Sequence, residues 1–283
     1  MSVAAQPESE QEALGDSRRD SGPGRRESPG SYLRFVALLV LAVLAFRSFL
    51  FTPFTIPSES MLPGLIKGDY LVAAKWPYGY SRWSLPFDAP LIEGTIAPRL
   101  PQRGDIAIFR HPVDGTEYIK RVIGLPGDTV ALRSGRVLLN GVPASHRRLA
   151  DFVLPVSPNT TCAWGAVEEA AANGGRQCRY ARFAETLPGG RSYPILDFGA
   201  TPQDDFGPIA VPAGHVFMLG DNRDNSQDSR FPPHAGGGVG LVPLPRLVGR
   251  AEIVLFSTDG AASWYNPLSW FAAARWSHMG DRL

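Results

Sequence analysis

Hydrophobic and polar positions divide the chain into a polar N-terminal stretch, one long apolar segment and a series of short apolar runs. Residues 1–31 are mostly Ser, Gly, Pro, Glu, Asp, Arg, Gln and Ala without apolar periodicity, which predicts a disordered tail. Between residues 33 and 51 only Arg34, Arg47 and Ser48 are polar. A helix over this segment would be about 28 Å long, close to the thickness of a bilayer core. We therefore predict a transmembrane anchor over residues 32–51.

The flanks of this apolar segment distinguish an uncleaved anchor from a removable signal sequence. Cleavage requires small residues two apart just after the apolar run, whereas residues 46–51 are mostly bulky. Basic residues gather on the N-terminal side, at Arg18, Arg19, Arg25, Arg26 and Arg34. By the positive-inside rule that side is cytoplasmic, so the tail is predicted in the cytoplasm and the rest of the chain outside it.

Beyond residue 60 the apolar runs are short and separated by turn signals such as Ser134-Gly135 and Asn140-Gly141, which predicts antiparallel strands. The strand candidates are residues 70–75, 105–110, 118–122, 129–132, 136–139, 216–219 and 251–256. Residues 165–173 form the one short helix candidate, and residues 81–101, 142–177 and 231–245 are predicted loops or insertions. The predicted fold class is mainly β, with long excursions from one core.

Composition narrows the function classes. The 283 residues include 28 basic and 27 acidic side chains, a net charge of +1, so no whole-chain basic footprint for nucleic acid exists. Apolar residues make up 44% and charged residues 19%, which excludes a fully disordered chain. The 30 Gly and 26 Pro residues are typical of a turn-rich β protein rather than a helical one.

Cys162 and Cys178 are the only cysteines. A compartment outside the cytoplasm permits a disulfide between them, which would stabilise the fold by about 3 kcal/mol in the chain-entropy model. Two unrelated thiols are the alternative. Two cysteines without nearby histidines do not predict a zinc site, and no metal or cofactor is expected.

Two segments place a reactive side chain in a restricted setting. Ser60 lies in a loop bracketed by Pro57 and Pro63, soon after the apolar segment, although serine-rich turns without chemistry are common. Lys120 shares one face of a predicted strand with Tyr118 and Val122, and burial between these apolar neighbours would lower its pKa. The alternative for this lysine is a solvated edge position that prevents unwanted strand pairing.

A third segment, residues 220–230, is a dense polar cluster directly after an apolar strand. It departs from the calcium-binding EF-hand pattern, since the glycine and the closing glutamate are missing and two arginines are present. A Ser-His-Asp triad is not predicted, because no Gly-x-Ser-x-Gly elbow surrounds Ser60. The five histidines also lie outside recognisable catalytic motifs: His111, His146, His215, His234 and His278.

Together these segments resemble type I signal peptidase, the membrane-anchored Ser/Lys endopeptidase family S26. The resemblance covers residues 34–257 and rests on motifs in the family's order: residues 57–63, 104–109, 120–128, 185–190 and 220–230. Two departures stand out. Glu59 replaces the glycine usual in the serine motif, and residues 231–239 intervene before the expected turn at Gly240-Leu241-Val242-Pro243.

The resemblance implies a mechanism with Ser60 as nucleophile and Lys120 as general base. The base must be neutral, yet only about 1 in 2,500 lysines is neutral at pH 7 when the pKa is about 10.4. Other roles are carried over by position: the Ser60 N–H and the Ser58 hydroxyl form the oxyanion hole, Ser226 orients Lys120, Asp228 and Arg230 form a supporting ion pair, and Phe54, Ile56 and Met61 line a pocket for small substrate side chains.

The resemblance also implies an organisation and partners. Residues 52–128 and 208–257 would form a barrel-like antiparallel catalytic core in the periplasm, beside the inner membrane, with residues 129–207 as an inserted β-rich subdomain. The expected partners are preproteins with signal peptides and the lipid bilayer, without nucleic acid or metal. Residues 258–283 are predicted to lie near the membrane, where Trp264, Trp270, Phe271 and Trp276 would enter the interface, or to dock as an amphipathic helix.

Two alternative functions remain open from the sequence. One is a related Ser/Lys maturation peptidase with a single dedicated client. The other is a catalytically silent, membrane-anchored β-domain that binds exported chains, which the presence of Ser58, Ser60, Lys120 and Ser226 argues against.

Overall fold

The computed structural model describes residues 29–85, 88–172, 174–263 and 265–283. The chain divides into two compact units, Met1–Ala42 and Val43–Leu283. The predicted disorder of residues 1–28, the end of the helix candidate at Asn173 and the membrane-interface role of Trp264 lie outside the described residues.

Helix α1 (Pro29–Phe49) is long and apolar enough to cross a bilayer, and nearly all of its side chains are exposed. It begins three residues before the predicted anchor, so the assignment of residues 29–31 to the tail is wrong. Proline is favoured in the first turn of a helix, where its missing N–H leaves no bond unmade. The helix ends before residue 51 because Phe51 already belongs to strand β1 (Phe51–Thr55).

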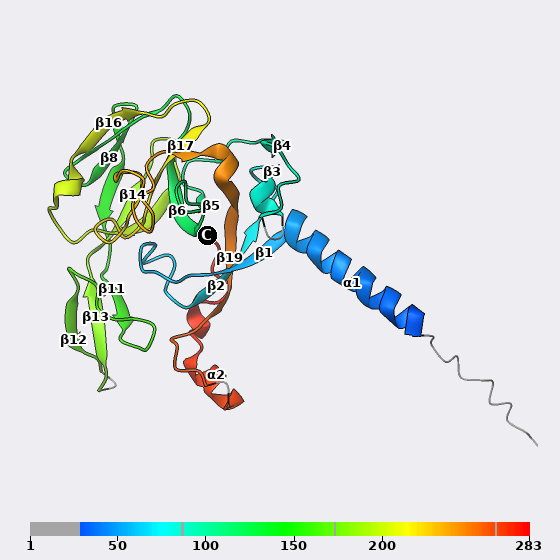
Figure 1. Ribbon diagram of the computed structural model, residues 1–283. Coiled ribbons are helices and arrows are strands. Elements are labelled where there is room, and N and C mark those ends of the chain that lie inside the picture. Colours follow the sequence, from blue (N-terminus) through cyan, green and yellow to red (C-terminus); the bar gives the residue numbers. More distant parts are fainter. Residues whose placement is uncertain (1–28, 86–87, 173, 264) are drawn as a thin grey trace, which may run out of the picture. The chain divides into compact units, whose positions relative to one another are not determined.

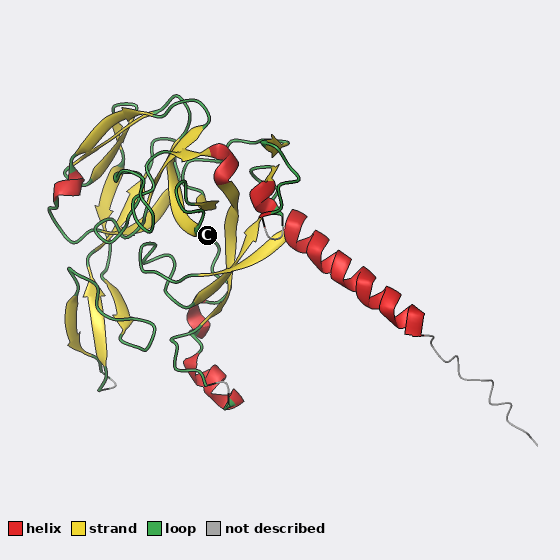
Figure 2. Ribbon diagram, in the orientation of Figure 1, coloured by secondary structure: helices red, strands yellow, loops and turns green. Residues whose placement is uncertain are grey.

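A seven-stranded sheet organises the larger unit (Figure 1), and its order is β1-β2-β19-β5-β6-β17-β18. Its further members are β2 (Asp69–Ala74), β5 (Ile106–Arg110), β6 (Glu117–Gly124), β17 (His215–Leu219), β18 (Val242–Pro243) and β19 (Leu247–Ser257). All neighbours pair antiparallel. The prediction of a mainly β, antiparallel fold is therefore confirmed, as Figure 2 shows.

Smaller sheets surround this one. Strands β7 (Thr129–Arg133), β8 (Arg136–Leu139), β9 (Val142–Pro143) and β16 (Phe206–Ala210) form one sheet, and β10 (Ser145–Arg148), β14 (Arg182–Thr186) and β15 (Ser192–Leu196) form another. A third contains β11 (Phe152–Pro155), β12 (Val167–Ala170) and β13 (Arg176–Tyr180), and β3 (Tyr80–Ser81) pairs with β4 (Thr95–Ile96). Helix α2 (Pro267–Ala273) and short 3-10 turns complete the fold.

The inserted residues 129–207 share an apolar core with the seven-stranded sheet. Ile123 of β6 and Phe217 of β17 pack in one buried cluster with Val130, Leu132 and Ile195 from the inserted strands. Burial of large apolar side chains is the main favourable contribution to folding. The insertion and the central sheet are therefore stabilised by the same packing.

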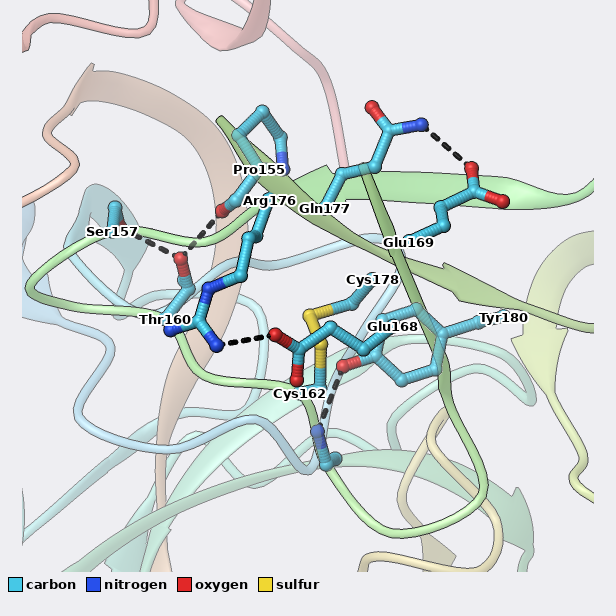
Figure 3. The surroundings of a disulfide bond; sticks show 11 residues. Pro155, Ser157, Thr160, Cys162, Glu168, Glu169, Arg176, Gln177, Cys178 and Tyr180 are labelled. Carbon is cyan, nitrogen blue, oxygen red and sulfur yellow. Dashed lines mark hydrogen bonds and ion pairs between the residues drawn. A yellow bond between two sulfur atoms is a disulfide. The ribbon is translucent and has the colours of Figure 1, made fainter. Parts of the chain in front are cut away.

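The helix predicted over residues 165–173 is wrong, because Val167–Ala170 forms strand β12. Ion pairs and hydrogen bonds reach across from β13, where Arg176 pairs with Glu168 at 2.6 Å and Gln177 donates to Glu169 at 2.6 Å (Figure 3). Cross-strand pairs of this kind stabilise a sheet much as i,i+4 pairs stabilise a helix. Strands β9 to β12 likewise replace much of the loop predicted over residues 142–177.

A disulfide joins Cys162 to Cys178 of β13 (Figure 3). Cys178 is fully buried and packs in a cluster with Leu62 of the serine motif and with Ile66, which lies shortly after it. The disulfide therefore joins the sheet of β11, β12 and β13 to its own loop. Apolar packing joins the same sheet to the segment after Ser60.

Replacing both cysteines with serine is expected to lower the free energy of unfolding by about 3 kcal/mol, because the unfolded chain regains the freedom of a loop of 16 residues. Urea denaturation of the Cys162→Ser/Cys178→Ser variant measures this loss. Reductant should destabilise the wild type by a similar amount and leave the variant unchanged. Equal stability of the oxidised wild type and the variant would contradict the prediction.

Candidate active site

The serine motif forms the connection between β1 and β2, held over the apolar core. The Ile56 N–H donates to the Asp69 carbonyl at 2.8 Å, and the Leu65 N–H donates to the Met61 carbonyl at 3.0 Å. Ile56, Met61 and Leu65 are buried in a single cluster below the loop. This packing fixes the position of Ser60, whose residue surface is only 8% exposed.

Lys120 reaches Ser60 from the middle of β6, sixty positions away in the sequence. Its Nζ donates to the Ser60 Oγ at 2.7 Å and to the Ile119 carbonyl at 3.1 Å. The pairing of β6 with β5, in which Lys120 lies opposite Ala107, sets the register that aims the amine at the serine. Both residues singled out from the sequence therefore meet in the structure.

The environment of Lys120 favours its neutral form. Burial lowers the pKa of the amine to about 8, against the opposing effects of the Asp228 and Asp221 carboxylates. The nearby Tyr118 ring, 5.6 Å from Nζ to the ring centroid, supplies part of the wall. An amine with this pKa is deprotonated in a useful fraction of molecules near neutral pH.

The loop after β17 packs directly against the serine loop. The backbone N–H of Asn222 donates to the Ser60 carbonyl at 3.1 Å, and its Nδ2 donates to the Glu59 carbonyl at 3.1 Å. A Cβ on Gly220 would lie 2.6 Å from the Ser60 carbonyl oxygen and 2.2 Å from the Ser226 Oγ. Only glycine permits this approach, so Gly220 sets how closely the two loops meet.

An ion pair within the same loop holds its shape. The Arg230 Nε donates to the Asp228 Oδ1 at 2.9 Å, and both side chains are buried. The Asp228 Oδ2 also accepts from the Gly220 N–H at 3.1 Å. Asp228 therefore links the beginning of the loop to its end.

Ser58 and Ser226 lie close to the pair but differ in their contacts. The Ser58 Oγ is 3.3 Å from the Ser60 Oγ. The Ser226 hydroxyl is buried, and within the described ranges it has no hydrogen-bond partner. The contact expected between Ser226 and Lys120 is thus not formed, since the amine is directed to Ser60 and to the Ile119 carbonyl instead.

A cavity of about 340 Å³ opens beside Ser60 and Lys120. Its remaining lining comes from residues Pro57, Ser58, Glu59, Glu117, Tyr118, Ile119, Asn225, Gln227 and Gly236. Of the residues predicted to line a substrate pocket, Ile56 and Met61 are buried in the core, and Phe54 lines a different cavity beside Lys75 and Trp83. The structure therefore does not bring these three to the described wall of the cavity at Ser60.

Glu59 stands where glycine was expected and lines the cavity that contains Ser60 and Lys120. Partial burial raises the pKa of its carboxyl group, while Lys67 and the Thr161 backbone N–H act to lower it. Thr161 precedes Cys162, so the glutamate faces the disulfide-bonded loop. The carboxyl group of Glu59 therefore has a basic side chain and a backbone donor in its surroundings.

A buried ion pair between Arg121 and Asp221 was not predicted from the sequence. The arginine donates through Nε to Oδ1 at 2.7 Å and through Nη2 to Oδ2 at 2.6 Å, with a third bond from Nη1 to the Gly104 carbonyl at 2.7 Å. Alternation along β6 places Arg121 on the face opposite Lys120. The sequence signal for this pair is Arg121 itself, a charged residue at an inward position of a strand, which requires a buried partner.

A serine hydroxyl that accepts a hydrogen bond from a buried amine of lowered pKa is the arrangement expected of a serine hydrolase that uses a lysine base. Across the described part of the chain, no group of three or more His, Cys, Asp or Glu side chains is arranged to hold a metal ion.

Comparison with known proteins identifies the family. Residues 30–256 match the model of the family described as signal peptidase, peptidase S26. Signal peptidase I of Rickettsia typhi is 34% identical over 260 residues, 88% of this chain and 87% of the relative. Signal peptidase I of Rickettsia massiliae is 36% identical, covering 82% and 80%. A signal peptidase I structure from Enterococcus faecalis is 26% identical and covers 54% of this chain and 97% of its own, with a TM-score of 0.28.

The chain therefore belongs to the S26 signal peptidase family, and it is a serine endopeptidase of the signal peptidase I type. The family's substrates are preproteins with signal peptides, and the apolar helix α1 fits association with a membrane.

Proposed function

We propose that this chain is a membrane-bound endopeptidase that removes N-terminal signal peptides from exported preproteins, with Ser60 as nucleophile and Lys120 as general base. The observation that carries the proposal is the 2.7 Å hydrogen bond between the Lys120 Nζ and the Ser60 Oγ. Its buried setting and the lowered pKa of Lys120 agree with the requirements of a lysine base.

The reaction proceeds by acyl transfer. The neutral Lys120 amine takes the proton from the Ser60 hydroxyl as the oxygen attacks the scissile carbonyl, and the resulting ammonium donates that proton to the leaving amine. The mature protein departs with a new N-terminus, and the signal peptide remains esterified to Ser60. Lys120, neutral again, then activates a water molecule that hydrolyses the ester.

The tetrahedral intermediate needs donors for its negative oxygen. We assign this role to the Ser60 N–H and to the Ser58 hydroxyl, which is 3.3 Å from the nucleophile. One such donor is typically worth about 3 kcal/mol of transition-state stabilisation. A rotation of the Ser58 side chain toward the bound carbonyl completes the site.

We assign Ser226 to orienting the Lys120 amine when Ser60 gives up its proton. Gly220 supports this role, because it brings the Ser226 Oγ and the Ser60 carbonyl to the same small space. The Ser226 hydroxyl has no other partner within the described residues, so it is available to the amine. Asp228 and Arg230 would keep Ser226 in place through their ion pair.

The proposed orientation of the chain in the membrane rests on the distribution of its basic residues. The arginines before α1 favour a cytoplasmic N-terminus, which places Ser60 in the periplasm at the outer face of the inner membrane. Substrates would bind as an extended strand, with small residues one and three positions before the cut.

The test is cleavage of a model preprotein by the purified full chain in detergent. We expect a single cut directly after a small-x-small sequence, read by N-terminal sequencing of the product, and a covalent adduct on Ser60 when a serine-acylating inhibitor is added. A panel of signal peptides distinguishes a general enzyme from one with a dedicated client. Absence of cleavage, or an adduct on another serine, would refute the proposal.

A further inference from the structure

The segment of residues 231–239, here called the insertion loop, is folded against the turn between β5 and β6. The Gly236 N–H donates to the Asp114 Oδ2 at 2.8 Å. The fully buried His111 ring lies 3.1 Å through Nε2 from the Gly238 carbonyl, while its Nδ1 accepts from the Val113 N–H at 3.2 Å. The ring therefore donates to Gly238, and the loop is latched at two points.

The insertion loop is also closed on itself. The His234 N–H donates to the Gly238 carbonyl at 3.0 Å, and the Gly237 N–H donates back to the His234 carbonyl at 3.1 Å. A Cβ on Gly237 would lie 1.9 Å from the His234 Nε2, and one on Gly238 would lie 2.5 Å from the Pro232 carbonyl oxygen. At Gly238 the close atom belongs to the backbone, so this position requires glycine, whereas at Gly237 the exposed His234 side chain could move aside.

The base of the insertion loop adjoins the loop after β17, residues 220–230. The Val239 N–H donates to the carbonyl of Asp228, the residue that links the two ends of that loop, at 3.3 Å. Val239 itself is buried in the core with Phe109 and Met218. The position of the insertion loop is therefore fixed relative to the Ser60–Lys120 pair.

The tip of the insertion loop reaches the cavity that contains the pair. Gly236 lines this cavity together with Ser60 and Lys120. Its φ is +71°, and a Cβ added there would meet nothing within 4 Å. This stretch of the cavity is consequently bounded by bare backbone, with room for a side chain contributed by a ligand.

We propose that the insertion loop is a wall of the substrate cleft and that Gly236 determines the size of a substrate residue flanking the scissile bond. This inference rests on the proposed function, because the ligand is an extended preprotein segment bound across Ser60. No atom lies within 4 Å of a Cβ position at Gly236, so a substrate side chain can approach the backbone there, and the hydrogen bonds at Asp114 and His111 hold this backbone in place.

The test measures kcat/KM for preproteins that carry small or large residues on either side of the cut. Gly236→Asn adds a side chain that tolerates positive φ. It is expected to lower kcat/KM at least about 10-fold for large flanking residues and under about 3-fold for small ones. Asp114→Ala removes the hydrogen bond to the Gly236 N–H and so loosens the wall. It is expected to raise kcat/KM for large flanking residues relative to small ones.

Gly214→Asn is the matched control. Gly214 has a φ of +77°, nothing within 4 Å of an added Cβ, and a position in the turn before β17, away from the cavity lining. Gly214→Asn should leave the ratio of kcat/KM for large and small flanking residues unchanged. If both Gly236→Asn and Asp114→Ala keep the wild-type preference, the inference is wrong although cleavage itself persists. If the wild type neither cleaves nor is acylated, the proposed function fails instead.

Discussion

Lys120→Met is expected to reduce kcat/KM for preprotein cleavage by about 10³–10⁴-fold, since the serine then has no base to accept its proton. Ser60→Ala should be at least as severe, because the nucleophile itself is lost. Methionine keeps the length and apolar packing of the lysine stem in its buried site. Cleavage of a model preprotein, followed over hours at high enzyme concentration, measures the residual rate. Near wild-type cleavage by either variant would exclude this pair.

The wild type should show the matching pH dependence. As the proposed general base, Lys120 has to be neutral. Its pKa is about 8, so kcat/KM should fall about tenfold per pH unit below pH 8 and level off above it. Lys120→Met should lack this limb of the profile. A flat profile between pH 6 and about 8 in the wild type would contradict the assignment.

Lys120→Met is expected to lower the rate of cleavage but to raise the stability of the fold at neutral pH. The folded-state pKa of Lys120 is lowered from about 10.5 to about 8, so the buried ammonium destabilises the folded state below pH 8. This penalty is about 3 kcal/mol near pH 7 and disappears as the pH rises through the unfolded pKa. Lys120→Met should therefore raise the free energy of unfolding at pH 7, as measured by urea denaturation in detergent, and gain little above pH 10.5.

Glu185→Ala is expected to lower the free energy of unfolding by about 3–5 kcal/mol, because it leaves the Arg223 guanidinium buried without its partner. Glu185 accepts from Arg223 at 3.0 Å through Oε2 and from the Tyr193 hydroxyl at 2.7 Å through Oε1. Burial by itself raises the pKa of Glu185, but Arg223 holds it below its ordinary value. Urea denaturation measures the loss.

The matched control for this pair is Glu169, which bonds to Arg179 on an exposed sheet face. Solvent screens an ion pair in such a position, so Glu169→Ala should have little effect on the free energy of unfolding. Replacing Glu185 and Arg223 together with methionine should recover much of the loss, since no unpaired charge remains. A similar small effect of Glu185→Ala and Glu169→Ala would show that burial does not distinguish the two pairs.

The sequence predicts the catalytic core well where local pattern and motif coincide. Lys120 lies on a strand between apolar neighbours, and the Pro-bracketed Ser60 lies in a loop, as the structure shows. The seven strand candidates correspond to strands β2, β5, β6, β7, β8, β17 and β19. Apolar alternation and turn residues are local signals, so they predict strands without knowledge of the tertiary fold.

Other features depend on contacts that no local pattern contains. Strand β12 has the composition of a polar helix, and only its pairing with β13 decides its conformation. The closeness of Gly220 to Ser60 arises between loops 160 residues apart, and the latch from His111 to Gly238 joins residues 127 apart. Motifs indicate which residues matter, whereas their distances follow from the assembled sheet.

The strand order has a consequence for how the Ser60–Lys120 pair is assembled during folding. Strand β2 and strand β5 are not neighbours, and β19, at residues 247–257, lies between them. The serine loop adjoins β2 and the lysine strand adjoins β5, so the elements that carry Ser60 and Lys120 are joined in the sheet through a strand that follows both of them in the sequence. Pairings so distant in sequence form late. Under the proposed mechanism, a chain in which β19 has not yet paired therefore holds both reactive side chains without the geometry that brings them together.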